Sequence, residues 1–197
     1  GMLSLPLIGV AQSGATFTPG PLMNSTRIVP FMATMSDGRV VAFGGRSYDF
    51  ISCAHADIYN PSTNTFTDVT MNYPHDGSYG VKLSSGKYFI IGGSMDLGVA
   101  PGYATTETFD PGTNTFTASG SMNYSRCSMG AAELADGKVL IAGAWYNTSG
   151  STYGEVYDPT GGTFTLTGSL IDPRANPLIL PTADTGAVLL GGYGAYG

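Results

Sequence analysis

The chain has 197 residues, a net charge of −6 and only 11% charged residues, and its lysines and arginines are scattered singly. This distribution offers no basic patch, so no nucleic-acid partner is predicted. No apolar run approaches the roughly 18 residues of a membrane-spanning helix, so no membrane insertion is expected. The abundance of Gly, Thr, Ser and Asn suits an all-β protein. It favours an extracellular, cell-surface or virion-associated location.

The chain is built from similar units of about fifty residues, and the first of these units contains four predicted strands. A two-residue turn, Asp37-Gly38, joins the first two strands, and Gly44-Gly45 ends the second. Asn60-Pro61 ends the third, because proline cannot donate to a strand ladder. The predicted strands are Ile28–Met35, Val40–Phe43, Ala56–Tyr59 and Thr65–Asp68.

This unit recurs along the chain. The small-residue pair that ends the second strand begins at Gly44, Gly92, Gly143 and Gly191, in steps of 48, 51 and 48. Continuing from Gly191 through the chain end to Gly44 gives a step of 50. A repeat near fifty residues that closes on itself indicates a ring of four-stranded blades, a β-propeller. The later predicted strands are Tyr88–Ile91, Thr106–Phe109, Thr115–Ala118, Val139–Ala142, Glu155–Tyr157, Thr163–Leu166, Leu178–Pro181 and Val188–Leu190.

The fourth unit has only two strands before the chain ends, and the N-terminus continues its spacing. Val10 follows Tyr157 by a step of 50, and Phe17 follows Phe164 by the same step. Two N-terminal strands, Leu5–Val10 and Ala15–Thr18, are therefore predicted to complete the last blade and close a four-bladed ring. The predicted blades of this single domain cover about 24–69, 72–119, 123–168, and 172–197 plus 4–19.

A second assembly remains open at this point. The chain could form half of an eight-bladed ring that a second chain completes, so a monomer and a homodimer are both compatible with the sequence.

The units resemble Kelch repeats, the family that includes the propeller domain of galactose oxidase. The resemblance rests on the diglycines, on a strand-3 aromatic followed by Asn-Pro or Asp-Pro, and on an acid two residues before that aromatic. Phe replaces the usual strand-4 Trp, and Gly143-Ala144 replaces one diglycine. The matching segments are Tyr59-Asn60-Pro61, Phe109-Asp110-Pro111, Tyr157-Asp158-Pro159, Asn64-Thr65-Phe66 and Asn114-Thr115-Phe116, with the acids Asp57, Glu107 and Glu155.

Seventeen residues before each strand-2 glycine stands a basic or imidazole side chain. These positions are predicted to ring one mouth of the channel, where guanidinium groups would form an anion or carboxylate site. The Kelch resemblance implies an alternative, in which each Arg pairs with its strand-3 acid as a structural bridge. His75 is interpreted as a substitute for Arg, and no metal site or cofactor is predicted. The four residues are Arg27, His75, Arg126 and Arg174.

The loops between strands 2 and 3 are rich in aromatic, amide and acidic side chains. Such groups suit a sugar ring, which needs a stacking surface and directional hydrogen bonds, and they also suit a protein interface. The alternative is a set of loops that pack on themselves. The candidate ligand-binding residues are Tyr48, Asp49, Tyr103, Trp145, Tyr146 and Asn147.

Asn24, Asn72 and Asn123 recur before strand 1 and are expected to form turns by bonding nearby backbone. No nucleophile elbow, phosphate loop or dinucleotide fingerprint occurs, and two histidines are too few for a galactose-oxidase-like copper site. The sequence therefore favours a non-catalytic module that binds a protein or a glycan. A hydrolase or lyase acting on an anionic sugar, and a purely oligomerising domain, are the alternatives.

Overall fold

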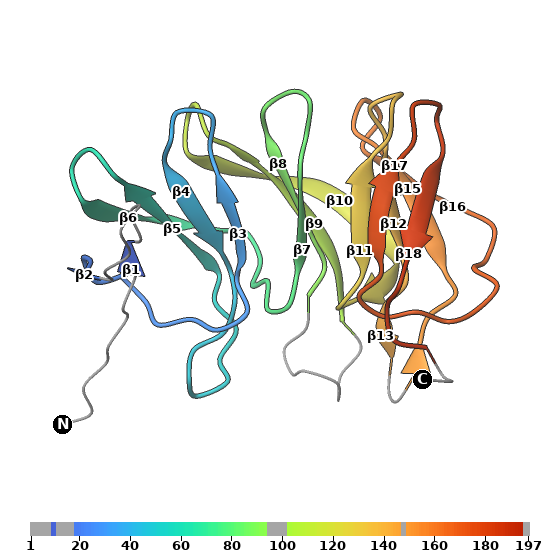
Figure 1. Cartoon of the computed structure of the whole chain (residues 1–197), viewed down its shortest axis with the longest axis horizontal. Helices are drawn as coiled ribbons and strands as arrows, with labels where there is room; N and C mark the ends of the chain where they lie inside the picture. Colours follow the sequence, from blue (N-terminus) through green and yellow to red (C-terminus); the bar gives the residue numbers. More distant parts are fainter. Residues whose placement is uncertain (1–8, 11–17, 94–101, 147–148, 195–197) are drawn as a thin grey trace.

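The structure is a computed structural model that describes residues 9–10, 18–93, 102–146 and 149–194. Within those ranges the chain is all-β and contains no helix. Three four-stranded antiparallel sheets and a two-stranded sheet follow one another as the blades of a β-propeller (Figure 1). Blade 1 and blade 4 lie on opposite sides of the molecule in this view.

Blades 1 to 3 are complete meanders, in which each strand pairs with the next. The turns hold residues with the positive φ that these positions require, such as Gly38 (φ 88°) and Asn64 (φ 56°). Blade 1 comprises β3 (Phe31–Thr34), β4 (Val40–Phe43), β5 (His55–Asn60) and β6 (Thr65–Thr70). Blade 2 comprises β7 (Tyr79–Lys82), β8 (Tyr88–Ile91), β9 (Tyr103–Asp110) and β10 (Thr115–Arg126), whose last residues, 123–126, lead into blade 3 and are counted with that blade. Blade 3 comprises β11 (Gly130–Glu133), β12 (Val139–Ala142), β15 (Gly154–Asp158) and β16 (Thr163–Leu166), with a small hairpin, β13 (Trp145–Tyr146) and β14 (Ser149–Gly150), in its β12–β15 loop.

Blade 4 has two described strands, β17 (Leu178–Pro181) and β18 (Ala187–Leu190), which pair only with each other. The N-terminal strands, β1 (Gly9–Val10) and β2 (Thr18–Pro19), form a separate antiparallel pair. The predicted N-terminal hairpin is therefore present at these residues, but its predicted attachment to blade 4 is not observed. The rest of the predicted strands Leu5–Val10 and Ala15–Thr18 lies outside the described residues.

The core lies between successive blades. Phe43 of blade 1 meets Phe109 of blade 2 edge-to-face, with 5.3 Å between ring centroids. Phe89 of blade 2 stacks on Tyr157 of blade 3 at 4.3 Å. Each blade thus turns one face, the next-blade face, toward its successor and the opposite face, the previous-blade face, toward its predecessor. Aromatic pairs add about 0.5–1.5 kcal/mol beyond the area that they bury.

The small-residue pairs set how closely the blades approach each other. A Cβ on Gly44 would collide with the backbone carbonyl of His75 in the next blade. The following residue, Gly45, donates its N–H to that same carbonyl at 2.7 Å. The same link joins Gly93 to the carbonyl of Arg126 at 2.9 Å, and Ala144 to that of Arg174 at 2.9 Å. A backbone hydrogen bond at this repeat position thus recurs between blades 1 and 2, blades 2 and 3, and blades 3 and 4.

Candidate functional site

Four side chains share one repeat position, which we call the bridge position: Arg27, His75, Arg126 and Arg174. Each contacts the backbone carbonyl of the strand-2 glycine 17 residues later. Arg27 also donates to the His55 carbonyl at 2.8 Å and to Oδ2 of Asp57 at 2.6 Å, with only 1% of its side chain exposed. Arg27 therefore ties strands 2 and 3 of its own blade together.

Arg126 makes the same contacts in blade 3. Its guanidinium donates to the Tyr153 carbonyl at 2.7 Å and to Oε1 of Glu155 at 2.8 Å. Burial acts to raise the pKa of Glu155. Hydrogen bonds from Arg126 and from Asn123 outweigh burial and hold that pKa below its ordinary value. The carboxylate is thus kept charged inside the blade.

An asparagine completes each bridge, which corrects the expectation that Asn24, Asn72 and Asn123 bond nearby backbone. Asn24 Nδ2 donates to Asp57 at 2.9 Å, and Asn123 Nδ2 donates to Glu155 at 2.8 Å. Asn72 donates to Oε2 of Glu107 through both its backbone and its side chain. These partners lie more than 30 residues apart in the chain, so the asparagines anchor the entry of each blade to its third strand.

His75 takes the place of arginine in blade 2. Its Nδ1 carries a proton, because the Gly92 carbonyl that it contacts can only accept. Its Nε2 lies 3.0 Å from Oε1 of Glu107, and both side chains are fully buried. His75 therefore acts within the blade and does not face solvent.

Arg174 differs from the other three. It keeps the bond to the Gly191 carbonyl at 2.9 Å, but its side chain is 37% exposed, and the acid beside it is its neighbour Asp172 at 4.0 Å. Arg27, His75 and Arg126 are thus internal bridges, as the Kelch resemblance implied. Their donors do not converge on an open anion site, and Arg174 is the one bridge position that reaches solvent.

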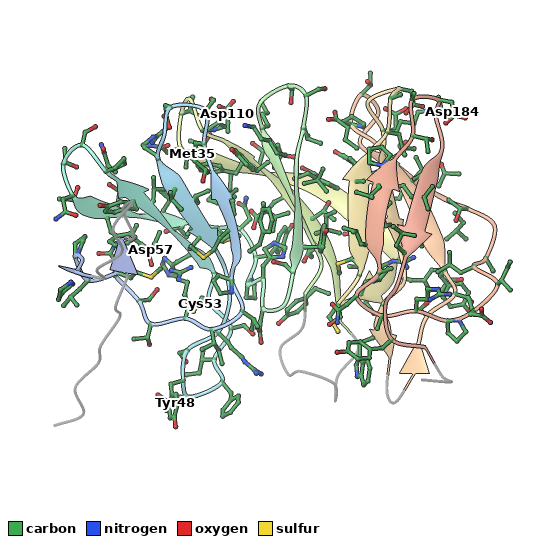
Figure 2. The ribbon with its side chains drawn as sticks, in the orientation of Figure 1. Met35, Tyr48, Cys53, Asp57, Asp110 and Asp184 are labelled. Carbon is green, nitrogen blue, oxygen red and sulfur yellow. The ribbon has the colours of Figure 1, made fainter. Side chains whose placement is uncertain are left out.

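Among the described residues, the β4–β5 loop, residues 44–54, carries a cluster of exposed large side chains. Tyr48 is 81% exposed, and Phe50 and Ile51 are 61% and 67% exposed. Asp49 is exposed between them. Figure 2 shows Tyr48 projecting at the end of the blades opposite Asp110 and Asp184. The predicted residues Tyr48 and Asp49 therefore do lie on an open loop.

The backbone of this loop is tied down despite its exposure. Arg46 exchanges backbone hydrogen bonds with Ile28, at 2.8 and 3.1 Å, and Ser47 accepts from Phe50 and donates to Ile51. The Arg46 guanidinium lies 4.9 Å from the centroid of the Phe50 ring and 3.7 Å from Asp76, which is fully buried. Phe50 itself has φ 63°, a backbone conformation that costs a non-glycine residue of order 1–3 kcal/mol.

Tyr103 and Trp145, two other predicted loop residues, are less exposed than Tyr48. Trp145 is half-buried, and its backbone N–H donates to the Cys127 carbonyl at 2.9 Å. Tyr146 continues β13, and Asn147 lies outside the described residues. Tyr103 is half-buried at the start of β9, and burial, assisted by the nearby Asp76 charge, raises its pKa.

Sequence reasoning missed Ile51 and a stacked pair, Tyr124 and Tyr153. The two rings lie 4.5 Å apart with an interplanar angle of 8°, and each residue is partly exposed. A signal for Ile51 was present, since Phe50-Ile51 is an apolar pair within a polar loop. No local signal could find the tyrosine pair, because its members come from segments 29 residues apart.

A cavity of about 600 Å³ lies between the outer strands of blades 2 and 3, away from these loops. Lys87 and Asp110 form an ion pair at 3.2 Å on its wall, and the hydroxyls of Thr108 and Ser119 bond each other at 2.6 Å. In the corresponding position between blades 1 and 2, Arg39 reaches across to Pro111 and Asn114. Lys87, at the repeat position of Arg39, instead pairs with Asp110 of its own blade.

The described residues contain no group of three or more His, Cys, Asp or Glu side chains that could hold a metal ion. Over the same ranges, no helix has the length and apolar character to cross a membrane.

Comparisons with known proteins support the propeller fold. No family model matches the chain. It is 32% identical over 111 residues to Kelch-like protein 28 of Mus musculus, a match covering 53% of this chain and 19% of that protein. A solved structure titled "Structure of YjhT" superposes with a TM-score of 0.65 at 15% identity, covering 84% of this chain and 62% of that one. The chain thus spans less than two thirds of either protein, and the structural likeness concerns the fold.

Proposed function

The chain is a Kelch-repeat β-propeller, and from that premise we propose that it is a non-catalytic recognition module that binds a protein through its β4–β5 loop. The observation that carries the proposal is the exposure of Tyr48, Phe50 and Ile51 on one tied-down loop. Large apolar side chains in contact with water favour burial against a partner.

The loop is organised before any partner arrives. Association is weakened when side chains and loops must be ordered on binding, at about 0.5–1.5 kcal/mol for each immobilised side chain. Here backbone hydrogen bonds hold Arg46, Ser47 and Phe50, and the guanidinium of Arg46 covers one side of the Phe50 ring. The strained backbone of Phe50 is kept in place by these contacts, as is common at functional loops.

A protein partner fits this loop better than a sugar does. A sugar site presents an aromatic face together with several hydrogen-bonding groups around it. The Phe50 ring already has Arg46 against it, and Ile51 offers no polar group. Tyrosine is enriched among the residues that dominate protein interfaces. A groove or pocket on the partner would receive Tyr48 and Ile51.

The test uses a displayed peptide library and a glycan array as probes. Peptides selected on the wild-type chain are expected to lose binding to Ile51→Asp and Tyr48→Ala while retaining it for Leu166→Asp. Leu166 is also an exposed aliphatic residue, 50% exposed, but it lies on β16 of blade 3. Thermal unfolding of each variant shows whether the fold is intact.

Equal loss for Ile51→Asp and Leu166→Asp would refute the loop as the binding surface. Glycan binding that is abolished by Trp145→Ala, with no peptide selected, would favour the glycan alternative.

A further inference from the structure

Blade 4 exposes an apolar face, whereas the corresponding face of blade 1 is buried. On the next-blade face of the β17–β18 hairpin, Leu178 lies opposite Leu190, and Leu180 lies opposite Val188. These four side chains are 46–50% exposed. At the same repeat positions of blade 1, Val41 and Phe43 are fully buried against blade 2. The face therefore has the shape and chemistry of a blade interface without a blade against it.

The edge of the same hairpin is also open. In blades 1 to 3 the second strand (β4, β8 or β12) pairs on both sides, whereas β18 pairs with β17 alone among the described strands. An unpaired strand edge presents backbone donors and acceptors to another strand. Blade 4 thus offers both a face and an edge.

Blade 1 carries the complementary face. Met32 on β3 is 54% exposed and occupies the position from which Gly80 and Ala131 face the preceding blade. Tyr59 occupies the position of Phe109 and Tyr157, each of which packs on an aromatic ring of the preceding blade. Tyr59 contacts Phe66 of its own blade at 5.2 Å and is half-buried. The previous-blade face of blade 1 therefore matches what blade 4 requires.

The backbone links between blades point the same way. Gly45, Gly93 and Ala144 each donate a backbone N–H to the bridge-position carbonyl of the next blade. Gly192 holds this repeat position in blade 4, and the pattern pairs its N–H with the backbone carbonyl of Arg27. Gly192 is exposed, unlike the three others. Arg27 is half-exposed although its side chain is 99% buried, so its backbone is the accessible part.

We propose that the open face of blade 4 binds the previous-blade face of blade 1 from a second copy of the chain. Two such contacts, related by a two-fold axis, join two chains into one ring. A second copy is the occupant that the geometry selects, because the chain's own blade 1 stands on the opposite side of the molecule (Figure 1). The β1–β2 hairpin directly precedes blade 1 in the chain. In the proposed pair, the hairpin of one copy therefore comes beside the open edge of β18 of the other copy.

Sedimentation equilibrium from nanomolar to high micromolar concentration tests the proposal. The mass is expected to rise from that of the 20.4 kDa chain to twice that value. Leu180→Glu on blade 4 and Met32→Glu on blade 1 should each abolish this rise, while Leu166→Glu, which carries the same charge on β16, should not. Each variant retains one intact face, so a mixture of Leu180→Glu with Met32→Glu should again form the heavier species.

Three results would overturn the proposal. The first is a constant mass of 20.4 kDa for the wild-type chain over the whole range. The second is association that Leu180→Glu and Leu166→Glu weaken equally. The third is a monomer whose unfolding temperature falls far more with Leu180→Glu than with Leu166→Glu, which would indicate that the chain's own first blade covers the face.

Discussion

Blades 3 and 4 carry the same repeat but use it differently. In blade 3, Arg126 is 1% exposed and held by Glu155, which Asn123 also binds. In blade 4, Arg174 is 37% exposed, and the position of Asn123 is occupied by Ile171, which is 99% exposed. The described part of blade 4 has no third strand to supply an acid. An arginine at the bridge position is therefore structural only where a complete blade surrounds it.

The largest expected effect is the loss of a complete bridge. Arg126→Met leaves Glu155 as a buried charge without its partner, which typically costs about 3–5 kcal/mol of unfolding free energy. Arg174→Met should change that free energy by less than about 0.5 kcal/mol. Urea unfolding followed by fluorescence measures both. Equal costs for the two variants would mean that Arg174 is also part of a buried bridge.

The apolar faces provide the second comparison. Val41 is fully buried and Val188 is 46% exposed at the same repeat position. Val41→Ala should cost about 1–3 kcal/mol of unfolding free energy through lost burial and a cavity. Val188→Ala should cost less than about 0.5 kcal/mol at a dilution where the chain is monomeric. A large cost for Val188→Ala at that dilution would contradict an uncovered blade 4.

The third comparison uses pH. The pKa of Glu155 in the folded state lies below its ordinary value of 4.5, so the unfolded chain binds its proton first as the pH falls. The stabilisation from Glu155 is complete above that ordinary value and is lost as the pH drops through the folded-state pKa. Each proton taken up lowers the unfolding free energy by at most about 1.4 kcal/mol per pH unit.

Glu155→Gln should therefore flatten the dependence of unfolding free energy on pH between about 5 and 3, as measured by urea midpoints at each pH. Unchanged steepness in this variant would show that other carboxylates account for the acid sensitivity. Asp110 and Asp158 also have lowered pKa values, mainly through backbone hydrogen bonds to their carboxylates, and they act in the same direction.

The smallest expected effect concerns the outer contact between blades 1 and 2. Arg39→Ala removes hydrogen bonds to the Pro111 carbonyl and the Asn114 side chain, so a loss of about 0.5–1.5 kcal/mol is expected in thermal or urea unfolding. Lys87→Ala is the control at the same repeat position, because the ion pair of Lys87 is with Asp110 of its own blade. A larger effect from Lys87→Ala would reverse the assignment of Arg39 as the contact between blades.

The sequence by itself determined the repeat, its phase and the position of most strands. These depend on short-range chemistry, such as the Asp37-Gly38 turn and the proline after Asn60, which act within a few residues. The bridge positions were also found, because Arg27 and Arg126 recur at a constant distance from a glycine.

Only the tertiary structure decided what those residues do. Whether Arg126 is buried depends on Glu155, 29 residues along the chain, and the role of Asn123 depends on the same acid, 32 residues along. Whether Leu180 faces protein or water depends on which blade comes to lie beside it. Burial and charge pairing are properties of neighbours in space, so a repeat whose local pattern is constant can bury one arginine and expose the next.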